Sequence, residues 1–243
     1  MTSSHSAAVI FDVDGTLVDS NDAHARAWIQ AFAEHEITVT YESVRRAIGM
    51  GGDKLMPLVA GIEEDSSQGK RISKRRQDIF KETYLPQLQP FPGVRGLAQR
   101  LVRDRFALAV ASSAKEDELH SLLDVAHVSD LIPTRTSSDD ADRSKPDPDI
   151  VTAAVKRAGC AKECTVMIGD TPYDVEAALR AGIQIIALTC GGWKADDLKG
   201  AVSVYRDPAD LLAQYDGSRL GQGFGAAGCE ADVGVRIPHT GSR

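Results

Sequence analysis

Short apolar segments alternate with helix-like segments along most of the chain, and this alternation limits the possible folds more than any other feature of the sequence. The apolar segments are four to seven residues long, and they span 7–13, 106–111, 165–168 and 183–188. The helix-like segments span 93–103, 115–126, 147–158 and 172–181. Strands and helices in this order form parallel βαβ units. We therefore predict an α/β fold with a Rossmann-like three-layer core, in which helices cover both faces of a parallel sheet.

The interval from residue 20 to residue 89 breaks this alternation, because it contains helix-like segments and no convincing strand. These segments span 22–34, 41–48, 53–60 and 66–85. We predict a helical cap domain over 18–89, inserted into a discontinuous core of 1–17 and 90–216, and we expect it to cover the strand ends as a lid. The last stretch, 217–243, holds seven of the 21 glycines and is predicted to be a flexible tail.

Composition argues against several partners. The 28 Lys and Arg residues are outnumbered by 35 Asp and Glu residues, and the formal net charge is -7, so the chain as a whole does not attract nucleic acid. No apolar segment approaches the ~20 residues of a membrane-spanning helix. The four cysteines include no CxxC pair and are expected to be buried or incidental thiols. We expect a cytoplasmic protein that binds neither nucleic acid nor a membrane.

Two acidic pairs follow predicted strands. Asp12 and Asp14 lie two residues apart in an extended segment, so their side chains project in the same direction, and Gly15 allows close approach of a ligand. Asp170 and Asp174 follow another strand. If the two strands are neighbours, these carboxylates converge, and they either raise one another's pKa or bind a cation. Because oxygen ligands favour a hard ion, we expect Mg2+.

Phosphate-binding groups follow other parts of the predicted sheet. Ser112, with Ser113 behind it, comes directly after 106–111 and can donate a hydroxyl hydrogen bond to a phosphate oxygen. Lys145 is a cation in a proline-flanked loop just before a helix. A carboxylate nucleophile, a second carboxylate, a hydroxyl, a lysine and a hard metal together indicate phosphoryl transfer.

In this order, the motifs resemble those of the haloacid dehalogenase superfamily. They are DVDGTLVDS at 12–20, Ser112 at a strand end, Lys145 before a proline, and GDTPYD at 169–174. The resemblance extends from about residue 7 to about residue 215. Because it includes several motifs, each at the end of a strand or in a loop, it is more specific than any one of them alone.

The resemblance implies a role for each matching residue. Asp12 would be the nucleophile that forms an aspartyl-phosphate, and Asp14 would act first as the general acid and then as the base. Ser112 and Lys145 would hold the phosphoryl oxygens. The implied metal ligands are Asp12, Asp170 and the backbone carbonyl of Asp14, with Asp174 either a ligand through water or a partner of Lys145.

The helical insert resembles the small cap of phosphoglycolate phosphatases and β-phosphoglucomutases. His24 matches a histidine near the cap hinge of the mutases, but glycine replaces the arginine that mutases carry in the cap loop at 48–54. Lys54 would be a poorer substitute for that arginine. The resemblance therefore favours a Mg2+-dependent phosphatase acting on a small phosphorylated metabolite, with a phosphohexomutase as the alternative. Besides Ser112, Ser113 and Lys145, the expected substrate-binding residues are His24, Gly51, Gly52 and Lys54.

Other polar features have simpler interpretations. Asp19 and Ser20 are expected to cap the first cap helix. The basic residues between Lys70 and Lys81 are interrupted by acidic ones and are expected to form a solvated helix face. A binding module without catalytic activity remains an alternative, although intact motifs argue against it. The expected oligomeric state is a monomer or a homodimer.

Overall fold

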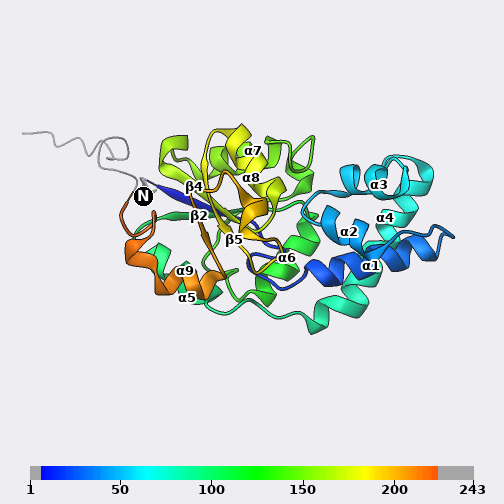
Figure 1. Ribbon diagram of the computed structural model, residues 1–243, viewed down its shortest axis with the longest axis horizontal. Coiled ribbons are helices and arrows are strands. Elements are labelled where there is room, and N and C mark those ends of the chain that lie inside the picture. Colours follow the sequence, from blue (N-terminus) through cyan, green and yellow to red (C-terminus); the bar gives the residue numbers. More distant parts are fainter. Residues whose placement is uncertain (1–6, 224–243) are drawn as a thin grey trace, which may run out of the picture.

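The computed structural model describes residues 7–223 and shows an α/β core with a helical cap at one end (Figure 1). Its sheet has the strand order β3-β2-β1-β4-β5-β6, and every neighbouring pair is parallel. The strands are β1 (Ala8–Phe11), β2 (Ala107–Ala111), β3 (Thr134–Thr136), β4 (Thr165–Gly169), β5 (Gln184–Leu188) and β6 (Ser203–Tyr205). The predicted Rossmann-like α/β fold is confirmed. The strand order reverses between β1 and β4, and in such sheets ligands bind at the carboxyl ends next to that point.

Alternate residues of each strand pack against opposite helical layers. Val9 and Phe11 of β1 belong to one apolar cluster, whereas Ile10 belongs to a second cluster on the other face. The first cluster includes residues of α5 (Val94–Arg103), α6 (Glu116–Val125) and α9 (Pro208–Ala213), and the second includes residues of α7 (Asp149–Ala158) and α8 (Pro172–Ala181). Because both faces are covered, the strand is apolar at every position, as expected for a buried parallel sheet.

The cap lies between β1 and α5 in the chain. Its helices are α1 (Asn21–Ala33), α2 (Tyr41–Ala47), α3 (Gly52–Ala60) and α4 (Ser67–Ile79). Helix α4 begins after Ser66, whose hydroxyl accepts a hydrogen bond from the Gly69 amide at 3.0 Å. Its buried Ile72 and Ile79 are two turns apart and therefore lie on the same face. The predicted helix at 66–85 is not α-helical throughout, since a π-helical turn follows α4 at Phe80–Tyr84.

Two strands were not predicted from the sequence. β3 and β6 are each three residues long and lie at the two edges of the sheet. β3 has the sequence Thr-Arg-Thr, and β6 is only half buried, so neither presents an apolar run. Short polar strands at a sheet edge give no strong periodic signal.

The predicted flexible tail at 217–243 is wrong for its first residues. Leu220 is 2% exposed and packs in the apolar cluster that contains α5 and α9, and Ser218 is also buried. Leu220 gives no apolar pattern in the sequence, because Gly217 and Gly221 lie on either side of it. The remainder of the predicted tail, 224–243, lies outside the described residues.

Two further expectations concern cysteines and membranes. Cys190 has a free thiol, as expected, and Cys229 lies outside the described residues. Between residues 7 and 223, none of the helices is both long enough and apolar enough to cross a bilayer.

Candidate active site

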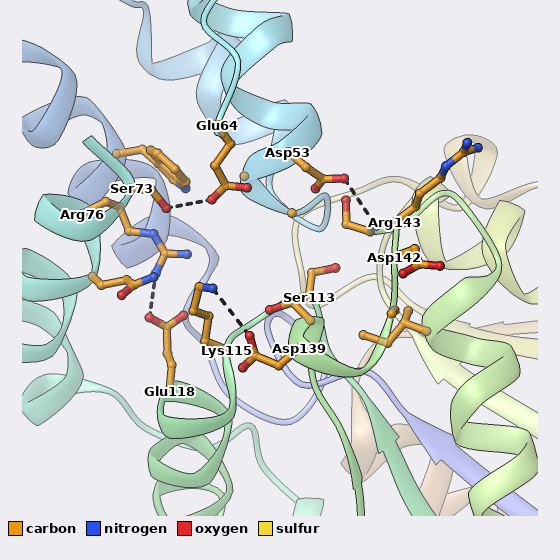
Figure 2. Close-up of a pocket in the computed structure, with 18 residues that line it drawn as sticks. Asp53, Glu64, Ser73, Arg76, Ser113, Lys115, Glu118, Asp139, Asp142 and Arg143 are labelled. Atoms are coloured by element: carbon orange, nitrogen blue, oxygen red, sulfur yellow. Dashed lines mark hydrogen bonds and ion pairs between the residues drawn. The ribbon is translucent and has the colours of Figure 1, made fainter. Parts of the chain in front are cut away.

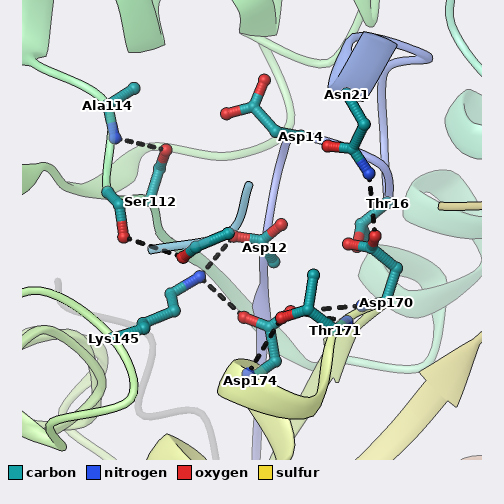
Figure 3. Close-up of polar contacts among 12 residues, drawn as sticks. Asp12, Asp14, Thr16, Asn21, Ser112, Ala114, Lys145, Asp170, Thr171 and Asp174 are labelled. Atoms are coloured by element: carbon teal, nitrogen blue, oxygen red, sulfur yellow. Dashed lines mark hydrogen bonds and ion pairs between the residues drawn. The ribbon is translucent and has the colours of Figure 1, made fainter. Parts of the chain in front are cut away.

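The acidic residues meet where β1 and β4 end side by side (Figure 3). The backbone N–H of Asp12 donates to the Ile168 carbonyl at 2.8 Å, which joins the ends of the two strands directly. Carboxylate oxygens of Asp12, Asp170 and Asp174 all lie within 4.8 Å of one another. The convergence expected from the two sequence motifs therefore occurs, because the strands that carry them are neighbours.

Each of the two downstream carboxylates is fixed by hydrogen bonds. Asp170 accepts from the Thr16 hydroxyl and from the Asn21 side-chain amide, both at 3.0 Å. Asp174 forms a capping box with Thr171 at the start of α8: its Oδ2 accepts from the Thr171 amide at 3.0 Å, and its amide donates to the Thr171 hydroxyl at 3.1 Å. The start of α8 thus orients Asp174, whereas Thr16 in the loop before α1 and Asn21 at the start of α1 orient Asp170.

Lys145 is fully buried and connects two of these carboxylates. Its ammonium group donates to Asp174 Oδ1 at 2.8 Å and also to Asp12 Oδ1. Burial opposes the charge of Lys145, but the carboxylates of Asp12 and Asp174 outweigh burial and raise the pKa of the ammonium group. Lys145 therefore remains charged and offsets part of the negative charge of the cluster.

The remaining negative charge is visible in the pKa values of the carboxylates. Burial raises the pKa of Asp12 to about 8, although Lys145 acts in the opposite direction, and the neighbouring carboxylates of Asp174 and Asp14 add to the rise. Burial also raises the pKa of Asp170 well above its usual range, with further contributions from Asp174 and Asp12. One lysine is therefore too little cationic charge for the cluster.

The residues present fit a divalent cation of the Mg2+ type. The donor set contains only oxygen, which suits a hard cation. Within residues 7–223 the second oxygen of Asp12, Oδ2, has no hydrogen-bond partner, whereas both oxygens of Asp174 have partners. Asp12 therefore has a carboxylate oxygen free for the ion. Asp170 accepts only from the neutral donors Thr16 and Asn21, whereas Asp174 is bound to the ammonium group of Lys145, so Asp170 is the better second ligand and Asp174 mainly orients Lys145 and the loop at Thr171.

Asp14 lies apart from the acidic cluster and contacts residues of the cap hinge. Its Oδ1 lies 2.7 Å from His24 Nε2 and accepts a hydrogen bond from the Ser20 hydroxyl at 2.5 Å. Burial raises the pKa of Asp14. The charge and hydrogen bond of His24 and the hydrogen bond of Ser20 lower it by more than burial raises it, so the pKa lies below its usual value. Asp14 is therefore ionised in this arrangement, which suits a base.

The structure corrects the role expected for Ser20. It does occupy the N-cap position of α1, but its side chain makes no capping hydrogen bond. The hydroxyl donates instead to Asp14, six residues earlier in the chain. The capping preference of serine gave the right position and the wrong partner, because the backbone of Ser20 is helical rather than extended, as a capping residue requires, and its hydroxyl is directed to the carboxylate of Asp14. Asp19 is exposed.

Ser112 and Ser113 lie at the end of β2, as predicted. The hydroxyl of Ser112 is buried and accepts from the Ala114 amide at 3.1 Å. The hydroxyl of Ser113 donates to the carbonyl of Gly49 in the cap loop at 3.4 Å. Ser112 is thus held by its own loop, whereas Ser113 joins the core to the cap.

The predicted substrate-binding residues of the cap do not all face the catalytic centre. Gly51 and Gly52 line the same small cavity as Asp12, Asp14 and His24. Lys54 does not line this cavity, and its ammonium group pairs with Asp147, which lies just before α7.

Sequence reasoning missed Arg76 as a residue of the cleft. Its side chain is only 15% exposed, lies over the Trp28 ring at 5.2 Å, and forms an ion pair with Glu118 of α6 at 2.6 Å. It also lines the cavity that contains Asp12 and Asp14. The prediction that the whole basic run is a solvated face is wrong for Arg76. The useful signal was the helical spacing, since Arg76 lies four residues after the buried Ile72 and four before the buried Phe80.

Asn21 and Gly191 are further site residues that the motifs did not reveal. Asn21 donates to Asp170 and also to the Gly191 carbonyl at 3.1 Å, and it is buried. A Cβ atom on Gly191 would lie 1.6 Å from Asp170 Oδ2, so only glycine leaves room for that carboxylate. The glycine pair at 191–192, which begins three residues after the last residue of β5, was the available signal for this close approach.

The fold and the site together define a hydrolase with an acidic, metal-compatible centre under a helical cap. Residues 9–188 match the family model described as haloacid dehalogenase-like hydrolase. The chain therefore belongs to the haloacid dehalogenase-like hydrolase family, as the motifs indicated.

Relatives and solved structures agree with this assignment. A probable phosphatase, IndB, from Dickeya dadantii is 32% identical over 199 residues, which cover 79% of this chain and 85% of the relative. A phosphoglycolate phosphatase from Rhodospirillum rubrum is 28% identical and covers 88% of this chain and 95% of its own length. The crystal structure of a hydrolase from Pseudomonas syringae has a TM-score of 0.79 and 30% identity, and it covers 86% of this chain and 98% of its own.

Proposed function

We propose that the protein is a Mg2+-dependent phosphatase that hydrolyses a small phosphorylated metabolite through an aspartyl-phosphate on Asp12. The observation that supports this most strongly is the buried cluster of Asp12, Asp170 and Asp174, which one lysine only partly neutralises. Such a site stabilises a cation and, with it, a dianionic phosphoryl group. The names of the relatives agree with a hydrolase of phosphoric monoesters. We expect a cytoplasmic monomer or homodimer.

Two chemical steps follow from this arrangement. In the first, the carboxylate of Asp12 attacks the phosphorus atom, the bond to the leaving oxygen breaks, and Asp14 gives its proton to that oxygen. In the second, Asp14 takes a proton from water, the water oxygen attacks phosphorus, and phosphate leaves as the carboxylate of Asp12 is restored. A bound Mg2+ would be held by Asp12 and Asp170, and it would offset negative charge on the phosphoryl oxygens.

The lowered pKa of Asp14 affects these two steps differently. The contacts with His24 and Ser20 favour its ionised form, which is the form that activates water in the second step. The first step needs the protonated form, and a dianionic phosphate beside Asp14 favours that form because like charges raise the pKa of a carboxyl group. Lys145 and the hydroxyl of Ser112 bind the phosphoryl oxygens in both steps.

A phosphate-release assay tests this function. Purified protein with Mg2+ should release inorganic phosphate from members of a panel of sugar and organic-acid phosphates, and excess EDTA should abolish release. Asp12→Asn should remove nearly all activity, because the amide cannot act as the nucleophile. Full activity of Asp12→Asn, or no release from any member of the panel, would contradict the proposal.

The phosphohexomutase alternative has a separate readout. It depended partly on Lys54 as a substitute for the mutase arginine, and Lys54 pairs with Asp147 instead. A mutase would interconvert hexose phosphates, respond to a bisphosphate activator and release little phosphate. Measuring isomer ratios and phosphate in the same reaction distinguishes the two enzymes.

A further inference from the structure

The catalytic centre continues into a second, larger cavity between the cap and the core. The cavity beside Asp12 and Asp14 has a volume of about 40 Å3, and the neighbouring one has a volume of about 190 Å3. The two share the lining residues Trp28, Gly51, Gly52, Arg76, Ser113 and Glu118. A phosphoester whose phosphoryl group lies at Asp12 would therefore extend its leaving group past these residues. Figure 2 shows Arg76, Ser113 and Glu118 among the residues that line the larger cavity.

Glu118 and Arg76 neutralise each other in the wall that the two cavities share. Arg76 Nη1 donates to Glu118 Oε2 at 2.6 Å, and their side chains are 15% and 4% exposed. The guanidinium group lies over the rings of Trp28 and Phe80, which hold it in place. Arg76 is the cationic residue among the lining residues that the two cavities share, and its charge is already paired with Glu118.

The other oxygen of Glu118 lacks a partner. Oε1 is buried and accepts no hydrogen bond from any residue in the part of the chain that the structure describes. An ionised oxygen in this condition is costly, because it has lost water and gained no donor. A ligand group that carries a hydrogen-bond donor would satisfy it, whereas an anionic group would be repelled.

The larger cavity is acidic beyond this pair. Its lining contains five carboxylates and three cationic side chains, so its formal charge is negative. Lys115 lies 3.5 Å from Asp139, whereas Glu64 accepts a hydrogen bond from the Ser73 hydroxyl at 2.8 Å and forms no ion pair with any residue between 7 and 223. An excess of carboxylates disfavours a second anionic group on the substrate.

We propose that Glu118 is a specificity-determining residue, and that its unpartnered oxygen selects a phosphomonoester whose leaving group is uncharged and carries hydroxyl groups. This inference rests on the proposed phosphatase function and specifies its substrate class. A hydroxyl can donate to Glu118 and accept from Arg76, so it suits both members of the pair. Leaving groups with a carboxylate or a second phosphate place a negative charge beside Glu118 and are disfavoured.

Matched substrate pairs test the inference. Glycerol 3-phosphate differs from 3-phosphoglycerate, and erythritol 4-phosphate from 4-phosphoerythronate, only in a terminal CH2OH in place of a carboxylate. For the wild-type protein, kcat/KM should be about tenfold or more higher for the hydroxyl-bearing member of each pair than for the carboxylate-bearing member. Glu118→Gln should reduce this preference about tenfold, mainly by improving kcat/KM for the carboxylate-bearing member, since repulsion is removed.

Glu116→Gln is the control for charge and helix position. Glu116 lies in the first turn of the same helix and is exposed, so this variant should keep the wild-type preference. A wild-type preference for the carboxylate-bearing substrates, or an equal loss of preference in both variants, would overturn the inference while leaving the phosphatase function intact. If Glu118→Gln does not fold, the wild-type ratio remains decisive. Absence of phosphate release from every substrate would instead refute the function itself.

Discussion

At the scale of single residues, the motifs indicate the groups of the proposed reaction, and neighbouring residues set the properties of these groups. Asp12 and Lys145 were assigned from the sequence, and the structure brings them into contact. The neighbours that tune the site were harder to find. Asn21 and Ser20 touch carboxylates of the two motifs through short hydrogen bonds, but serine and asparagine are common at helix starts for unrelated reasons. Residue type alone could not distinguish these roles.

Gly191 gives a prediction at this scale. We expect Gly191→Ala to displace the Asp170 carboxylate, because its Cβ would lie 1.6 Å from Asp170 Oδ2. The Mg2+ concentration for half-maximal phosphate release should rise about tenfold or more, by analogy with substitutions that disturb metal-ligand orientation. Gly217→Ala is a suitable control, because a Cβ atom added there would have no neighbouring atom within 4 Å. An unchanged Mg2+ requirement in Gly191→Ala would show that Asp170 does not bind the ion.

At the scale of elements, apolar periodicity located most strands and helices of the core and cap. It failed for β3 and β6, which are three residues long and lie at the sheet edges. It also failed to distinguish the α-helical part of 66–85 from the π-helical turn at Phe80–Tyr84. These details depend on neighbours in space, since edge strands are fixed by the strand beside them and the π turn accompanies the stacking of Phe80 on His24 at 4.0 Å.

An ion pair beside the Lys145 loop gives a pH-dependent prediction for one element. Two hydrogen bonds from Arg157 of α7 and the backbone amide of Ser137 lower the pKa of Asp140 to about 2. The stabilisation is present above the unfolded-state pKa of about 3.9 and is lost as the pH falls towards 2.

Asp140→Asn should therefore lower the Tm at pH 7 by about 2–4 °C, the effect of roughly 1 kcal/mol in a chain of this size. The expected effect is small because Arg157 is 44% exposed and its ion pair is screened by solvent. The difference in Tm between variant and wild type should shrink between pH 4 and pH 2 in thermal melts. Asp142→Asn, in the same loop, should show no such pH-dependent difference. A constant difference across this range would argue against the ion pair.

At the scale of the whole molecule, polar contacts join the cap to the core across the cleft. They include Lys54 with Asp147, Arg76 with Glu118, and the Tyr173 hydroxyl with the Arg46 carbonyl at 2.7 Å. Most involve residues that were not expected to interact, because the partners lie far apart in the sequence. Lys54 illustrates the point: its charge and its position in the cap loop suggested a phosphate ligand, and only the closed arrangement shows its partner.

Lys54→Met tests whether these contacts hold the cap in place. Removing the ion pair with Asp147 should favour a more open molecule, so the radius of gyration in solution scattering should increase and kcat/KM should fall. Lys74→Met removes an exposed ion pair with Asp78 inside α4 and is the matched control. If Lys54→Met leaves the radius of gyration unchanged, or Lys74→Met increases it equally, the Lys54 contact does not control closure.

The sequence by itself determined the α/β core, the inserted helical cap and the identity of the principal acidic residues, because apolar periodicity and short local motifs encode them. The tertiary structure alone decided which charges face one another. It placed Asp12, Asp170 and Asp174 together, turned Lys54 towards Asp147, and buried Arg76 against Glu118 beside the catalytic cavity. The physical reason is that charge interactions depend on distances in space, and these distances join residues whose separation along the chain carries no signal.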